Sequence, residues 1–147
     1  PHPSFSGPVR LRRCIVPSSG FYICRLQGTG KHPCFLRLAE DEVFALAVIC
    51  DHWEGKQVDV SESVAIITTT ANELMQPIHD RMPVILEEED VSAWIAPTTK
   101  LEKALAMLKP CSSTRMMTYP VSSLVNSTRH DGPECVAKVD ETVPDQF

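Results

Sequence analysis

The sequence predicts an α+β domain built on antiparallel β-sheet, and two observations support this prediction. Short apolar runs rich in β-branched residues follow one another through the first two-thirds of the chain, whereas helical periodicity begins only after them. Strands in succession with helices behind them are typical of α+β folds, in contrast to the alternation of βαβ units. We expect one domain over residues 1–147, a length that can bury a real core.

Seven segments carry the strand pattern. A glycine-containing connection at residues 27–31 predicts a hairpin between the second strand and the third. A late strand is also predicted beyond the helical region, at residues 116–121. The predicted strands are residues 13–16, 21–27, 34–38, 44–50, 64–68, 84–86 and 116–121.

Two helices follow the sixth strand. Four acids at residues 87–90 suit a helix N-terminus, where the macrodipole favours negative charge, and they precede an apolar face that includes Trp94. Thr99 and Glu102 fit a capping box, and apolar residues at helical spacing then continue to Pro110. Both apolar faces indicate packing surfaces and imply no cofactor.

Charge is unevenly distributed along the chain. The net charge is −5, which argues against non-specific nucleic-acid binding by the molecule as a whole. Residues 1–39, however, carry six basic residues and no acid, whereas residues 40–147 carry 8 basic and 19 acidic residues. The basic segment suggests a local phosphate-binding face; alternatively, its charges are solvated and discourage aggregation at strand edges. No apolar run approaches the roughly 18 residues that a membrane span needs, so no membrane partner is expected.

Six cysteines are present, and none forms a Cys-x-x-Cys pair or lies at zinc-finger spacing from a histidine, so we expect no metal. Cys14, Cys34 and Cys50 lie in apolar runs, where a free cysteine packs as a small hydrophobic residue. The pattern favours a reduced, cytoplasmic protein. A secreted domain with three disulfides is the alternative, disfavoured by the lack of a secretory signal. No P-loop or dinucleotide-binding glycine motif occurs, so no nucleotide cofactor is indicated.

The most informative stretch is residues 78–83, with the sequence IHDRMP. It places His79, Asp80 and Arg81 side by side, between apolar runs at residues 64–67 and 84–86. An imidazole beside a fixed cation, on a connection between buried strands, is a common arrangement for proton transfer next to an anion. The alternative is a surface turn in which His79 only forms local hydrogen bonds.

Three groups of residues resemble the motifs of the SOS response-associated peptidase (SRAP) family. They occur in the family's order and at its spacing, from about Ser4 to about Val139. Each group alone is weakly specific, but together they are highly specific. The first group is residues 13–22 (RCIVPSSGFY), the second is residues 68–74 (TTTANEL) followed by 77–83, and the third is residues 119–122, 125–126 and 131–134.

The resemblance implies a barrel-like antiparallel core with short flanking helices. It also implies binding of abasic sites in single-stranded DNA. In the family, an N-terminal cysteine forms a thiazolidine crosslink with the abasic sugar, and the same cysteine is thought to remove the initiator methionine. This chain begins with Pro1, lacks a counterpart of the family's asparagine and has Ile23 where the family has glutamate. We therefore expect it to correspond to the C-terminal part of the domain, with the N-terminal part missing and a degenerate active site.

The resemblance also assigns roles to individual residues. His79 is the expected proton shuttle, and we predict that it lies in a concave site shared with Thr68, Arg81 and residues 21–23. Arg81 is expected to contact phosphate or deoxyribose through its planar donor fork. The residues expected to contact DNA are Arg81, Thr68, Arg12, Arg13 and Tyr22.

A second function remains open. Ile23 carries no proton and orients no amine, which favours a non-catalytic remnant that binds single-stranded DNA weakly or has only a structural role. The intact motif around His79 favours a retained site. The sequence leaves the oligomeric state open.

Overall fold

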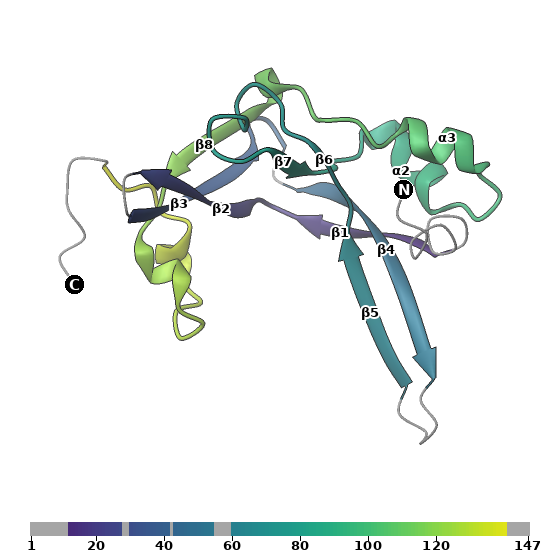
Figure 1. The fold of residues 1–147 in the computed structure, drawn as a ribbon, viewed down its shortest axis with the longest axis horizontal. Helices are drawn as coiled ribbons and strands as arrows, with labels where there is room; N and C mark the ends of the chain where they lie inside the picture. The colour runs from purple at the N-terminus through teal and green to yellow at the C-terminus, as the bar shows by residue number, and fades with distance from the viewer. Residues whose placement is uncertain (1–11, 28–29, 42, 55–59, 141–147) are drawn as a thin grey trace.

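The computed structural model describes residues 12–27, 30–41, 43–54 and 60–140 (Figure 1). These ranges contain three antiparallel sheets, and α2 and α3 are their helices. The elements are β1 (Arg13–Ser18), β2 (Phe21–Gln27), β3 (Gly30–Leu38), β4 (Phe44–Glu54), β5 (Val60–Ile66), β6 (Thr68–Thr70), β7 (Arg81–Pro83), α2 (Glu88–Ile95), α3 (Leu101–Ala106) and β8 (Met116–Pro120), with 3-10 turns η2 (Ser113–Arg115), η3 (Ser123–Asn126) and η4 (Pro133–Cys135).

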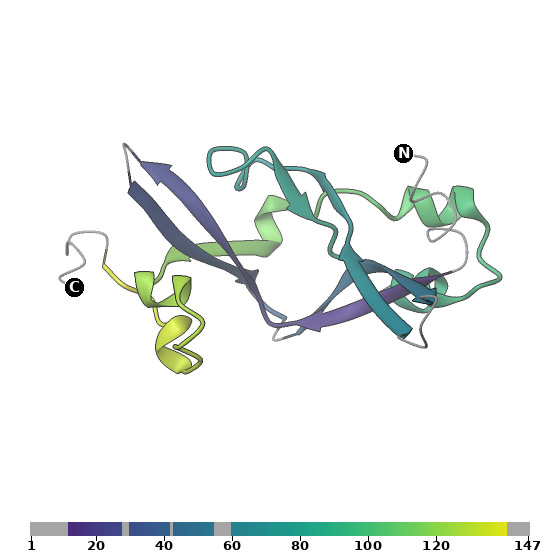
Figure 2. The ribbon, with the colours of Figure 1, turned by 60° about the horizontal axis from the view of Figure 1, so that its bottom comes forward.

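The two larger sheets have the strand orders β1-β4-β5 and β2-β3-β8, and they lie at opposite ends of an elongated molecule (Figures 1 and 2). β1 and β2 follow each other across a bend at Ser19 and Gly20, while their partners β4 and β3 return along them. Gly20 is required at this bend, because a Cβ there would lie 2.2 Å from the Phe35 ring. The α+β prediction is confirmed, but the described strands form open sheets, so the barrel-like closure implied by the resemblance is not observed.

Two element predictions are wrong. Residues 84–86 do not form a regular strand; β7 ends at Pro83, and only Ile85 makes an isolated bridge, to Leu46. The predicted capping box at Thr99 is also absent, because the N-cap of α3 is Lys100 and no side chain caps it. The backbone carbonyl of Thr99 instead accepts a hydrogen bond from Arg13. Residues 84–86 nevertheless bond to β4, through the Val84 carbonyl and the Leu86 N–H.

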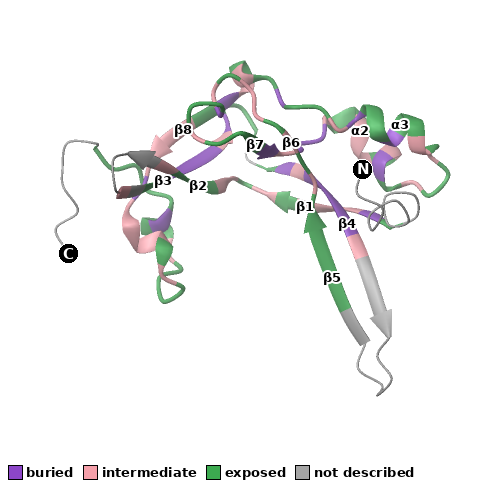
Figure 3. Ribbon diagram, in the orientation of Figure 1, coloured by how far each residue is buried: buried purple, intermediate pink, exposed green. Residues whose placement is uncertain are grey.

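Among the described residues, two clusters form the hydrophobic core, and their buried members lie mainly in β3, in β4 and in residues 82–86 (Figure 3). The first cluster packs β3 and β4 against Met75 and Met82, which flank residues 76–81. The second packs Ala47 and Val84 against Trp94 and the start of the segment after α3. In the described part of β5, residues 62–66 are all exposed. None of the described helices is both long and apolar enough to span a membrane.

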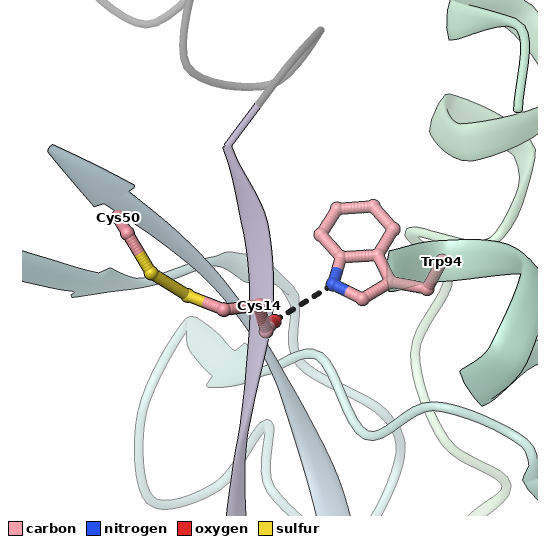
Figure 4. The surroundings of a disulfide bond; sticks show 3 residues. All are labelled: Cys14, Cys50 and Trp94. Carbon is pink, nitrogen blue, oxygen red and sulfur yellow. Dashed lines mark hydrogen bonds between the residues drawn. A yellow bond between two sulfur atoms is a disulfide. The ribbon is translucent and has the colours of Figure 1, made fainter. Parts of the chain in front are cut away.

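Cys14 and Cys50 form a disulfide that joins β1 to β4 (Figure 4). This corrects the prediction that both are reduced and pack as free thiols, whereas Cys34 is a buried residue of the core, as predicted. The register pairs Cys14 with Val48, so Cys50 is the next residue along β4 on the same face. The two Cα atoms lie 6.5 Å apart, within bridging range.

Candidate functional site

The β6–β7 pair carries the predicted motif. Its register pairs Thr68 with Pro83 and Thr70 with Arg81, and residues 71–80 form the connection. The Asn72 side chain shapes this connection: its Oδ1 accepts from the backbone N–H of Met75 at 3.0 Å, and its Nδ2 donates to the carbonyl of Cys111 at 2.8 Å. The loop that carries His79 is therefore anchored to the body of the protein.

Arg81 is exposed, yet its guanidinium has a fixed position. Nε donates to Oγ1 of Thr68 at 2.8 Å, and Nη2 donates to the Thr68 carbonyl at 2.7 Å. A guanidinium carries further N–H donors in the same plane, and among the described residues these have no acceptor, so they face solvent. Thr68 thus orients a planar cation with unused donors.

His79 lies next to Arg81, with 52% of its side chain exposed. Its Nδ1 is 3.0 Å from the backbone N–H nitrogen of Arg81, 3.1 Å from the Arg81 carbonyl and 3.0 Å from Oδ1 of Asp80. As an acceptor, neutral Nδ1 receives the Arg81 N–H; as a donor, protonated Nδ1–H meets the carbonyl or the carboxylate. No described residue bonds to Nε2, which leaves that nitrogen open to a ligand.

The β2 strand lies beneath the same region. Phe21 and Ile23 pack against the first core cluster, together with Ala71 and Leu74 of the loop. Met82 of β7 is a buried member of the same cluster, so β2 and β7 both contribute to one part of the core. The polar contacts of the His79 ring are with Asp80 and Arg81.

Tyr22 faces the other side of β2, since successive side chains of a strand alternate. Its ring lies 5.2 Å from that of Phe35, which in turn lies 5.8 Å from Tyr119. Burial raises the pKa of Tyr22, with smaller contributions from Cys135, Tyr119 and Asp131. Tyr22 therefore belongs to an aromatic row on the sheet face opposite Ile23, apart from the His79 cluster.

The two arginines at the start of β1 have separate environments. Arg12 is exposed, and its carbonyl accepts from the backbone N–H of Cys50 at 2.8 Å. Arg13 is only 7% exposed, and its Nε donates to the Trp94 carbonyl at 2.5 Å while Nη2 donates to the Ala96 carbonyl at 2.6 Å. The guanidinium thus satisfies the C-terminal carbonyls of α2, a helix with no basic residue in its own last turn.

The sequence analysis assigned no role to Asn72 or Asp80. Both lie inside motifs that it did identify, at residues 68–74 and 77–83. Sequence proximity could have suggested Asp80 as a partner of His79. The bond from Asn72 to Cys111 joins positions 39 residues apart, so no local signal predicts it. Within the described ranges, no three His, Cys, Asp or Glu side chains are grouped to hold a metal.

Comparison with known proteins adds independent evidence. The chain is 39% identical over 136 residues to Abasic site processing protein YoqW of Bacillus subtilis (strain 168), covering 91% of this chain and 61% of that protein. It is 32% identical over 166 residues to Abasic site processing protein HMCES of Gallus gallus, covering 96% of this chain and 48% of that protein. The chain thus spans less than two-thirds of these relatives.

Solved structures share the fold. A crystal structure of a Bacteroides thetaiotaomicron protein matches with a TM-score of 0.87 and 32% identity, over 93% of this chain and 61% of that one. A Bordetella bronchiseptica protein matches with a TM-score of 0.73 and 20% identity, over 80% of this chain and 59% of that one. Residues 1–128 match the family described as SOS response associated peptidase (SRAP). The chain therefore belongs to the SRAP family.

Proposed function

We propose that this chain binds abasic sites in single-stranded DNA through Thr68, His79 and Arg81, named here the β6–β7 cluster. The relatives named as abasic site processing proteins support this proposal. The observation that carries it is the Arg81 guanidinium, which Thr68 holds at an exposed position with donors left over. A phosphate or a deoxyribose hydroxyl is the natural acceptor for such a planar fork.

Single-stranded DNA suits the shape of this surface. The cluster lies on an exposed two-stranded sheet, and the loop before β7 is anchored through Asn72. In a duplex the opposite strand constrains the backbone, whereas a single strand can turn its baseless sugar and the neighbouring phosphate toward this surface. On a chain with a net charge of −5, a local phosphate contact should give weak, salt-sensitive affinity.

His79 supplies the proton chemistry in this proposal. An abasic deoxyribose interconverts between a closed hemiacetal and an open aldehyde. Opening removes the proton of the C1′ hydroxyl, forms the carbonyl, breaks the bond to the ring oxygen and protonates that oxygen. The exposed Nε2 of His79 accepts and returns this proton, while Nδ1 finds a partner in either protonation state.

Covalent capture requires more than the β6–β7 cluster. In the family, a thiazolidine forms when one residue supplies both an α-amine and a thiol to the aldehyde. Thr68, His79 and Arg81 supply no such pair, so we expect the β6–β7 cluster by itself to bind abasic DNA reversibly.

The test is fluorescence anisotropy with three labelled DNAs of equal length: a single strand with a tetrahydrofuran abasic analogue, the same strand undamaged, and the abasic strand in duplex. The abasic single strand should bind most tightly. Equal affinity for all three DNAs would contradict the proposed site.

A non-catalytic structural module is the second candidate. One observation favours it: Ile23 replaces the family glutamate and packs against the first core cluster, so it offers the sugar no polar group. Under this alternative, none of the three DNAs binds measurably at low salt. The same titration therefore separates the two candidates.

A further inference from the structure

A second concave surface lies away from the β6–β7 cluster. It is a groove of about 510 Å³ between β1, the β3–β4 connection and the start of α2. We call it the acidic groove. Its lining residues are Ile15, Pro17, Leu38, Glu40, Asp41, Val43, Phe44, Ala45, Leu86, Glu88, Val91 and Arg115.

Charge in the acidic groove is predominantly negative. Three carboxylates and one guanidinium line it, which gives 1 − 3 = −2. The guanidinium of Arg115 is already engaged, because it bonds to Glu87 and, at 3.2 Å, to Asp41. The hydrogen bond to Glu87 is the main cause that raises the pKa of Arg115, and the hydrogen bond to Asp41 raises it further. Arg115 therefore stays charged and offsets these two carboxylates in part. The unengaged charge belongs to Glu40 and Glu88, which have no partner among the described residues.

The helix dipole does not cancel this negative charge. The N-terminus of α2 contributes roughly half a positive charge. Its first turn, however, contains Glu88, Glu89 and Asp90, which together exceed that contribution. The groove therefore repels nucleic acid and acidic peptides, and it attracts Lys or Arg side chains.

Apolar side chains also line the groove. Val43 is 62% exposed although it directly precedes a buried strand residue, and Ile15 and Val91 are half-buried. Leu86 and Phe44 are buried members of the same lining. A ligand that satisfies both features must bury an apolar side chain and present cations to the carboxylates.

We propose that the acidic groove docks a short segment of a partner protein in which apolar side chains alternate with Lys or Arg. Glu40 and Glu88 receive the cations, and Val43 and Val91 cover the apolar side chain. This surface shares no residue with the β6–β7 cluster. Binding of the segment is therefore independent of DNA binding, and the groove links a DNA-bound molecule to a second protein.

The probe is a fluorescein-labelled hexapeptide of alternating leucine and lysine, titrated with the full chain and followed by anisotropy. Two matched peptides isolate the two features: alternating serine and lysine, and alternating leucine and glutamate. We expect only the leucine–lysine peptide to bind. The double variant E40K/E88K should weaken it by about tenfold, because two flanking charges are reversed.

The matched control is E62K/E102K, which changes the net charge by the same amount at two exposed positions outside the groove. It should leave the affinity for the leucine–lysine peptide within about twofold. V43D, at an exposed position, should weaken binding without unfolding the protein, as checked by circular dichroism. Equal binding of the serine–lysine peptide, or equal losses in the two double variants, would overturn the proposal, as would absence of binding to all three peptides.

Discussion

Arg13 and Arg81 provide the sharpest contrast in the molecule. Both are arginines expected from the sequence to contact DNA, and both donate through Nε and Nη2 to acceptors on a single neighbouring segment. Arg13 is 7% exposed, and its guanidinium carbon lies over the Trp94 ring, 5.7 Å from the ring centroid. Arg81 is exposed and retains donors that face solvent. Burial, and not residue type, separates the arginine that stabilises the fold from the one available to a ligand.

The largest expected effect follows from removing Arg13. R13A leaves the buried carbonyls at the end of α2 without a charged donor, and the free energy of unfolding should fall by about 2–4 kcal/mol. Urea denaturation followed by circular dichroism measures this change. R13K is the matched control, since it restores the charge but not the fork, and it should recover only part of the loss. An unchanged midpoint for R13A would contradict the assigned role.

A smaller effect is expected at Asn72, which anchors the loop of the exposed arginine. N72A removes the bonds to Met75 and Cys111, so the free energy of unfolding should fall by about 1–2 kcal/mol. DNA affinity should fall as well, since the loop carries His79. Full DNA affinity in N72A, despite the lower stability, would show that the anchored loop is not needed for binding.

A change at Thr68 tests only how Arg81 is oriented. T68V keeps the shape of the side chain but removes the Oγ1 acceptor, while the Thr68 carbonyl remains. Affinity for abasic single-stranded DNA should fall by about threefold, the equivalent of one modest hydrogen bond, with little change in stability. T68S, which keeps the hydroxyl, serves as the control and should bind like the parent. Anisotropy titration of both variants makes the comparison, and equal affinities would mean that the hydroxyl does not position Arg81.

Two cysteines show the same contrast between an exposed and a buried side chain, and they give the smallest expected effect. Cys24 is exposed and free, whereas Cys111 is buried, and burial raises the pKa of its thiol. Because the thiolate is the reactive form, iodoacetamide at pH 8 should label Cys24 well before Cys111 in the folded protein. Mass spectrometry of peptides from a short labelling reaction gives the order. Equal labelling would show that the core around Cys111 is open.

Much of the fold was predictable because its signals are local. The strand β2 and the two helices follow directly from apolar periodicity and turn residues. The burial of Arg13 was not predictable, because its acceptors lie more than 80 residues away on α2. The Cys14–Cys50 disulfide likewise depends on the β1–β4 register, which no short segment encodes.

Arg81 is the residue that we propose contacts the phosphate or sugar of an abasic single strand. Anisotropy titrations of the tetrahydrofuran-containing strand at several salt concentrations compare the parent chain with R81A. We predict that R81A binds about tenfold more weakly at low salt and that the slope of log affinity against log salt becomes shallower by about 0.7, the value for one phosphate contact on a single strand. Unchanged affinity and an unchanged slope in folded R81A would contradict the proposed contact.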